Sequence, residues 1–310
     1  MVLTTARRRR RLRAMEATPA TEARNVTGAE LDLLSTTELV MLMNREDALV
    51  PVAVGAAGQA VADVVDAVAA RLRAGGRLVY AGAGTSGSLA ALDASECEAT
   101  FGIGCDQVVA AVAGADAQSS SEREAAEDDE TAGRHALQEL NVGAKDAVVA
   151  VSASGGTPFT LGAARVAAAA GAFTACVVCV PHSQLAAVCE REIMVLVGPE
   201  ILAGSTRLKA GTAQKLVLNT ISTVAMIRLG KTYAGLMVGV VASNDKLRER
   251  VRRIVSEATG APSDAIDAAL AAADGEARVA IVSLLGDVDA ASARTRLEAA
   301  GGNVREALDR

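Results

Sequence analysis

Two short segments of the chain combine glycines with clustered hydroxyl side chains, and each directly follows an apolar run. The first contains Gly84, Thr85, Ser86 and Gly87, and the second contains Ser152, Ser154 and Thr157. Both precede helix-compatible sequence. The N–H groups at the start of a helix are unpaired, and the helix dipole favours negative charge there. Two such turns predict that one phosphate is held from both sides, the alternative being that Ser and Thr only cap two helices.

The first turn also matches the spacing Gly-x-Gly-x-x-Gly of dinucleotide-binding sites, at Gly82, Gly84 and Gly87. Such sites have an acidic residue about 20 positions further on, at the end of the next strand. Asp116 lies later than that. The second hydroxyl-rich turn therefore favours a compact phosphate over a dinucleotide.

Carboxylates near these turns are candidates for proton transfer. Glu96 lies a few helical turns after the first segment, on the helix that this segment opens. A second group of acids follows, and the residues alone do not distinguish among its members, which are Glu122, Glu124, Glu127, Asp128, Asp129 and Glu130. The sequence thus predicts a phosphorylated ligand with an acid or a base beside it.

The composition excludes several classes of protein. The 310 residues are 51% hydrophobic and 2% aromatic, with a net charge of −6, so the chain has a large core but few aromatic platforms for stacking bases. Outside the basic start, which includes Arg7–Arg11, the chain is acidic, which argues against nucleic-acid binding.

No apolar stretch is long enough to span a membrane. Five cysteines, most of them in apolar runs, are typical of reduced thiols, so we expect a cytoplasmic protein without a metal site.

The elements that position the turns follow from the apolar pattern. Near-continuous apolar runs predict five strands at Leu78–Ala81, Val108–Val112, Ala147–Val151, Thr174–Val180 and Ile193–Val197. Intervening helical segments include Glu122–Leu140 and Thr157–Ala170. This alternation predicts an α/β fold, a doubly wound five-stranded parallel sheet, with its ligand beyond the carboxyl ends of the strands.

The remaining segments predict three parts. Residues 1–25 form a flexible basic leader, residues 26–249 form the sheet domain with N-terminal helices, and residues 250–310 form a small helical bundle of the UBA-like kind. Ser35 and Glu38 have capping-box spacing, and Pro51 suits the start of a helix.

The pairing of turns resembles the sugar isomerase (SIS) domain, a phosphosugar-binding fold. The wider sequence resembles the N-acetylmuramic acid 6-phosphate etherase family, from about Thr21 to Arg310. The resemblance is carried by Thr21–Asn25, Asp32–Thr36, Asn44–Asp47, Gly82–Gly87, Leu92–Cys97, Lys209–Asn219 and Leu236–Val238.

This resemblance implies an enzyme that cleaves the ether between the sugar and D-lactate with no cofactor and no metal. It implies that Glu96 is the catalytic acid and Glu127 the second catalytic carboxylate, and that the protein is a cytoplasmic homodimer with its site near the subunit interface. Ser88 and Gly156 stand where the family usually has arginine, which leaves Arg207 and Lys209 as the cationic candidates for substrate binding.

Three other functions fit parts of the pattern. A non-catalytic phosphosugar sensor of the glucokinase regulatory protein type shares the architecture, although such proteins generally carry two of these domains. An aldose–ketose isomerase would use the same fold, but the block Lys209–Asn219 argues against it. A nicotinamide-dependent oxidoreductase is the most distant alternative.

Overall fold

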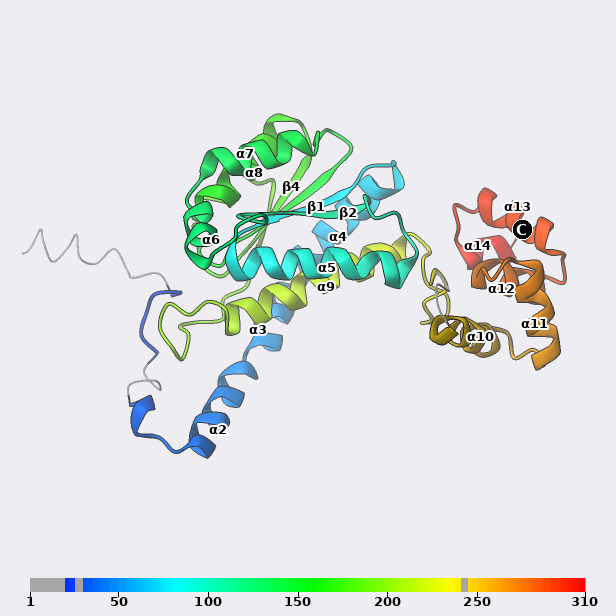
Figure 1. Cartoon of the computed structure of the whole chain (residues 1–310), viewed down its shortest axis with the longest axis horizontal. Coiled ribbons are helices and arrows are strands. Elements are labelled where there is room, and N and C mark those ends of the chain that lie inside the picture. Colours follow the sequence, from blue (N-terminus) through cyan, green and yellow to red (C-terminus); the bar gives the residue numbers. More distant parts are fainter. Residues whose placement is uncertain (1–19, 26–29, 241–244, 310) are drawn as a thin grey trace, which may run out of the picture.

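The computed structural model describes residues 20–25, 30–240 and 245–309, and its centre is a five-stranded parallel sheet (Figure 1). The strand order is β2-β1-β3-β4-β5. The strands are β1 (Leu78–Gly82), β2 (Val108–Val112), β3 (Ala147–Val151), β4 (Phe173–Val178) and β5 (Arg191–Met194). The prediction of a doubly wound parallel sheet is confirmed. The fifth strand begins and ends earlier than predicted, before the apolar residues that follow it.

Helices cover both faces of the sheet. On one face α4 (Gly58–Arg73), α5 (Gly84–Phe101) and α9 (Lys209–Arg228) pack in the largest hydrophobic cluster. On the other face lie α7 (Glu130–Glu139) and α8 (Pro158–Ala169). Every residue of β1, β3 and β4 is buried, which explains why these strands are continuously apolar rather than alternating.

The N-terminal part of the described chain consists of short helices. They are η2 (Leu31–Leu33), α2 (Thr36–Asp47) and α3 (Val50–Ala56). The predicted capping box is present, because Ser35 and Glu38 bond each other's backbone N–H groups. Pro51 lies in the first turn of α3, as predicted. Helix α2 extends away from the sheet (Figure 1).

The C-terminal part is helical and has a hydrophobic cluster of its own. Its helices are α10 (Asp245–Thr259), α11 (Ser263–Ala272), α12 (Ala277–Gly286), α13 (Ala290–Ala299) and α14 (Val304–Leu308). They lie to one side of the sheet, beyond the end of α9 (Figure 1). Val238 and Val240 belong to the same cluster.

Two predicted segments differ in the structure. The single helix predicted for Glu122–Leu140 is two helices, α6 (Ser120–Glu127) and α7, because Asp129 caps the start of α7 through the N–H of Ala132. Most of the predicted leader lies outside the described residues. Within it Thr21 is buried, and its carbonyl accepts a hydrogen bond from the N–H of Gly204.

Among the described helices, none alone is long and apolar enough to cross a membrane. One pair bent by 60°, Thr36–Ala56 with Gly58–Arg73, passes that test by length and composition only.

Candidate functional site

The two hydroxyl-rich turns meet at the point where the strand order reverses. Strands β1 and β3 are neighbours, and Gly82 at the end of β1 is paired with Val151 at the end of β3. Paired residues on neighbouring strands are about 5 Å apart. Because β2 lies outward on one side and β4 on the other, the chain leaves β1 and β3 in opposite directions and opens a crevice between the two turns.

The first turn is the amino end of α5. Ala83 occupies the N-cap and offers no side-chain acceptor, so the first N–H groups of the helix are available to another acceptor. Gly84 begins the helix with φ of +52°, a conformation that favours glycine. Thr85 is exposed and Ser86 is half-buried. This arrangement suits an anion bound by backbone N–H groups and hydroxyls.

Glu127 brings a carboxylate to this helix end. A Cβ placed on Gly84 would lie 2.7 Å from Oε1 of Glu127. Glu127 is the last residue of α6, where the break between α6 and α7 turns the chain. Burial raises the pKa of the Glu127 carboxyl, and the charges of Asp128 and Glu124 raise it further. A carboxylate with these surroundings is a stronger base than an ordinary glutamate.

The structure distinguishes Glu127 from the other acids of its run. Glu122 accepts a hydrogen bond from the N–H of Gln118. Asp129 caps α7, and Glu130 forms ion pairs with Arg134 and Arg165. Glu124 and Asp128 are exposed. Glu127 is therefore the acid of this run that packs against the first turn.

The second turn is held together by its own hydroxyls. Ser152 is buried, and its Oγ lies 2.9 Å from Oγ1 of Thr157 and accepts a hydrogen bond from the N–H of Gly155. Ser154 is exposed, and its Oγ accepts from the N–H of Gly156. The seven residues predicted to bind substrate in the two turns thus line neighbouring ends of β1 and β3.

Glu96 is not close to Glu127 in one chain. It lies on α5, twelve positions after Gly84. A helix rises 1.5 Å per residue, so the two positions are about 18 Å apart along the axis. Glu96 is exposed. Its neighbour Asp93 is buried instead and accepts hydrogen bonds from Tyr80, Asn219 and Ser222.

The two predicted cationic residues have different positions. Arg207 is exposed in the loop before α9. Lys209 is buried, and its Nζ lies 2.6 Å from Oε2 of Glu46 in an ion pair. Substrate binding by Lys209 stays a prediction; in the structure its ammonium has a carboxylate partner in Glu46 and joins α9 to the N-terminal helix α2.

Two residues of the site region were not predicted. Gln214 on α9 is buried, and its Oε1 accepts a hydrogen bond of 2.9 Å from Oγ of Ser86. Glu200 is also buried, and its two oxygens accept from the N–H groups of Lys209 and Ala210 at the start of α9. Both lie in or near a motif of the sequence, but only the tertiary fold gives them these partners, through the packing of α9 against α5 for Gln214 and the loop before α9 for Glu200.

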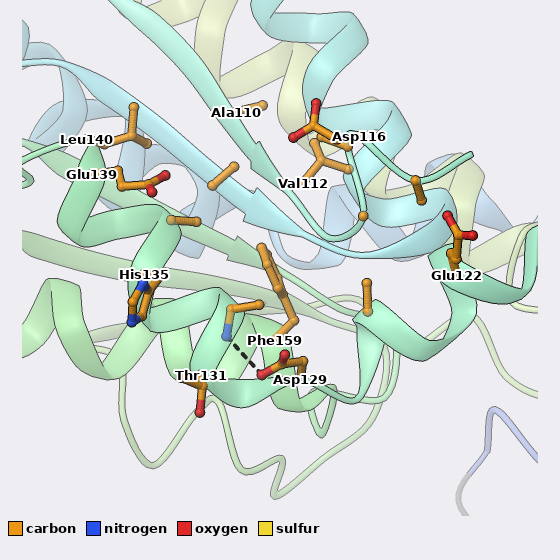
Figure 2. A pocket seen from close by; sticks show the side chains of 17 residues that line it. Ala110, Val112, Asp116, Glu122, Asp129, Thr131, His135, Glu139, Leu140 and Phe159 are labelled. Atoms are coloured by element: carbon orange, nitrogen blue, oxygen red, sulfur yellow. Dashed lines mark hydrogen bonds between the residues drawn. The ribbon is translucent and has the colours of Figure 1, made fainter. Parts of the chain in front are cut away.

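A cavity of about 810 Å³ lies elsewhere (Figure 2). It is lined by edge strand β2, α6, α7 and the loop after β2, and the labelled Asp116, Glu122, His135 and Glu139 surround it. The described residues of the two turns and Glu127 do not line it. The geometry of the turns identifies the site better than cavity size does.

Comparison with known proteins supports a phosphosugar site. The sequence model of the glucokinase regulatory protein N-terminal SIS domain matches residues 60–168. The chain is 56% identical over 288 residues to the N-acetylmuramic acid 6-phosphate etherase of Rubrobacter xylanophilus, which covers 93% of this chain and 95% of that protein. It is 52% identical over 297 residues to the etherase of Streptomyces coelicolor, with 96% of each chain covered.

Among solved structures, a phosphoheptose isomerase from Francisella tularensis aligns with a TM-score of 0.49 and 14% identity, covering 63% of this chain and 100% of that one.

Proposed function

The chain belongs to the N-acetylmuramic acid 6-phosphate etherase family, and we propose that it cleaves the lactyl ether of N-acetylmuramic acid 6-phosphate, giving N-acetylglucosamine 6-phosphate and D-lactate. The observation that carries this proposal is the identity of 56% to one such etherase over nearly the whole of both chains. The carboxylate of Glu127 beside the first hydroxyl-rich turn is consistent with it. The enzyme is a carbon–oxygen lyase.

The reaction needs proton transfers and a phosphate anchor. In the open-chain sugar, the carbon next to the aldehyde carries an acidic hydrogen, which a carboxylate removes. The bond from the adjacent carbon to the lactyl oxygen then breaks, and an acid protonates the departing lactate. Water adds to the resulting double bond, with hydroxyl on the carbon that lost lactate and hydrogen on the carbon next to the aldehyde. Two placed carboxyl groups supply these steps.

We assign Glu127 as the base and Glu96 as the acid. The raised pKa of Glu127 favours proton acceptance. The two turns, with Gly84, Thr85, Ser86, Gly87, Ser152, Ser154 and Thr157, bind the phosphate. Arg207, exposed in the loop before α9, and Lys209, at the start of α9, are the cationic candidates for the ligand.

A second copy of the chain completes the site in this proposal. The separation of about 18 Å along α5 keeps Glu96 of one chain away from its own first turn. Symmetric dimers bring the same surface of each copy together, so Glu96 of one copy can reach the turns of the other. Exposed apolar side chains suit such a contact, with Leu33 74%, Val40 63%, Met41 59% and Val52 75% exposed on the N-terminal helices.

We also propose that the dimer acts in the cytoplasm and binds neither nucleic acid nor membrane. All five cysteines are free, which fits a reducing compartment. The acidic net charge of −6 disfavours nucleic-acid binding.

Release of D-lactate from N-acetylmuramic acid 6-phosphate tests the function. The wild type releases lactate, Glu96→Ala does not, and Glu98→Ala, on the same exposed stretch of α5, serves as the control that keeps activity. Absence of lactate with the wild type, together with calorimetric binding of the phosphosugar, would instead support the sensor.

A mixing experiment tests the shared site. Glu96→Ala and Glu127→Ala chains are unfolded and refolded together. If each site uses both copies, mixed dimers hold one intact site, and activity returns to about a quarter of the wild type. If both carboxylates act within one copy, the mixture stays inactive.

A further inference from the structure

Gln214 carries a buried polar atom without a partner next to the first turn. Its side chain is 1% exposed, and its Oε1 accepts the hydroxyl hydrogen of Ser86. Its Nε2 is buried and has no hydrogen-bond partner among the described residues. A buried amide N–H₂ without an acceptor is costly, so this atom needs an explanation.

A half-turn of the amide exchanges the positions of its oxygen and nitrogen. In that orientation Nε2 donates to Oγ of Ser86, and Oε1 takes the place without a partner. Each orientation pairs one polar atom of the amide with Ser86 and leaves the other without a partner. The two orientations differ in where the hydroxyl of Ser86 can donate, because a hydroxyl has only one hydrogen to donate. In the first orientation that hydrogen is used by Gln214, and in the second it is free.

The surroundings allow Gln214 little other motion. The start of α9 is fixed by Glu200, which accepts from two N–H groups of its first turn, and by the ion pair of Lys209 with Glu46. Further along α9, a Cβ on Gly211 would lie 3.4 Å from Cγ2 of Thr85, so the helix packs directly on the first turn of α5. The backbone that carries Gln214 is therefore held in place, and rotation of the terminal amide needs no movement of α9.

We propose that Gln214 is a positioning residue that directs the hydroxyl of Ser86 to the bound phosphate. When phosphate occupies the amino end of α5, the amide turns, Nε2 donates to Ser86, and Ser86 donates its hydrogen to a phosphate oxygen. A hydrogen bond to a charged group is stronger than one to an amide, so bound phosphate favours the orientation in which Nε2 donates to Ser86. This inference rests on the proposed phosphosugar site, but it does not depend on ether cleavage.

Binding of N-acetylglucosamine 6-phosphate, measured by calorimetry, tests the coupling of the two residues. We expect Ser86→Ala to raise Kd about 10-fold, the lower end for loss of a hydrogen bond to a charged group, and Gln214→Met about 3- to 10-fold, the range of a hydrogen bond between neutral groups. In the Ser86→Ala background, Gln214→Met changes Kd by less than about 2-fold, because its partner is gone. Gln59→Met, exposed on α4 and bonded to Asp63, is the control with unchanged Kd.

A second variant and a kinetic readout separate positioning from folding. Gln214→Glu keeps the shape but only accepts, so it retains the hydrogen of Ser86 and weakens binding more than Gln214→Met. With N-acetylmuramic acid 6-phosphate, we expect KM to rise in both variants while kcat stays within about 2-fold.

The proposal is overturned if Gln214→Met leaves Kd unchanged with Ser86 present. It is equally overturned if the loss is the same with and without Ser86, since Gln214 would then act on the ligand or on the fold. Failure of the wild type to bind the phosphosugar at all would be a different result, because it would reject the proposed phosphosugar site itself.

Discussion

The sheet has an amino edge, where its parallel strands begin, and a carboxyl edge, where they end. One carboxyl group at each edge has its pKa shifted, in opposite directions. At the amino edge, Asp146 precedes β3 and is bonded by the N–H and guanidinium of Arg77, which precedes β1, and by the N–H of Gly143. At the carboxyl edge, Glu127 packs against Gly84 and has no basic partner among the described residues. Gln214, at the same edge, has an unpaired Nε2.

The difference between the edges is one of partners rather than of burial. Burial acts to raise the pKa of both carboxyls. For Asp146, hydrogen bonds from Arg77 and from the N–H of Gly143 outweigh it and hold the pKa below its usual value. For Glu127, the neighbouring charges of Asp128 and Glu124 add to the effect of burial, and the pKa is raised. The amino edge is built for stability and the carboxyl edge for proton transfer.

The largest expected effect is on catalysis at the carboxyl edge. Glu127→Gln lowers kcat by about 10²- to 10⁴-fold, the contribution of a placed acid or base. Because ionisation of Glu127 is disfavoured in the folded state, the neutral variant unfolds at the same or a slightly higher temperature at pH 7. Lactate release and thermal unfolding measure the two effects, with exposed Glu124→Gln as the control. A large loss of stability in Glu127→Gln would contradict the conclusion that the carboxyl edge serves proton transfer rather than stability.

The matching change at the amino edge acts on stability. Asp146→Asn removes the charge that Arg77 faces and lowers the free energy of unfolding by about 2–3 kcal/mol, with kcat little changed. The pKa of Asp146 is lowered in the folded state, so its contribution is present above its unfolded pKa of about 4 and is lost as the pH falls through the folded value.

Urea unfolding at pH 7 and at pH 3 therefore gives a larger difference between wild type and Asp146→Asn at pH 7. The exposed pair of Arg252 with Asp267 provides the control, because solvent screens this pair and Asp267→Asn therefore costs much less stability than Asp146→Asn. Equal losses for both pairs would show that burial at the amino edge does not matter.

A substitution at Gly84 has a smaller effect and acts on both properties. Gly84→Ala places a Cβ 2.7 Å from Oε1 of Glu127, at a residue with φ of +52°. We expect about 1–2 kcal/mol lower stability from the strained backbone and about 10-fold lower kcat from the displaced carboxylate. Gly58→Ala, where the space is open, is the control. Unchanged kcat in Gly84→Ala would show that catalysis does not depend on the position of the Glu127 carboxylate against the first turn.

The smallest expected effect concerns pH. Both Glu124→Gln and Asp128→Asn remove a charge that raises the pKa of Glu127, so the acid limb of the pH profile of kcat/KM moves to lower pH. Both side chains are exposed, and salt screens their effect. The shift therefore shrinks at high ionic strength. A shift to higher pH would contradict the assignment of Glu127 as the base.

Much of the fold followed from local pattern. The runs at Leu78 and Ala147 predicted β1 and β3 at nearly the observed bounds, because a strand buried on both faces must be apolar throughout. The apolar run at Val108 also predicted the bounds of β2, although this edge strand is only partly buried. The fifth strand was misplaced, since β5 is an edge strand with exposed Arg191 and its apolar residues continue past its end. The break between α6 and α7 was missed, because helical sequence continues through Asp128 and only the cap at Asp129 divides it.

By itself the sequence determined the parallel sheet, the two hydroxyl-rich turns at its carboxyl edge and the acidic run that contains Glu127. Those features are local, since they depend on which residues follow one another and which are apolar. Only the tertiary structure decided which partners the polar groups have. It placed Glu127 rather than its neighbours against Gly84, paired buried Lys209 with Glu46, and left one end of Gln214 without a partner. Partners come from distant segments, and burial in a low-dielectric interior makes each of these pairings energetically important.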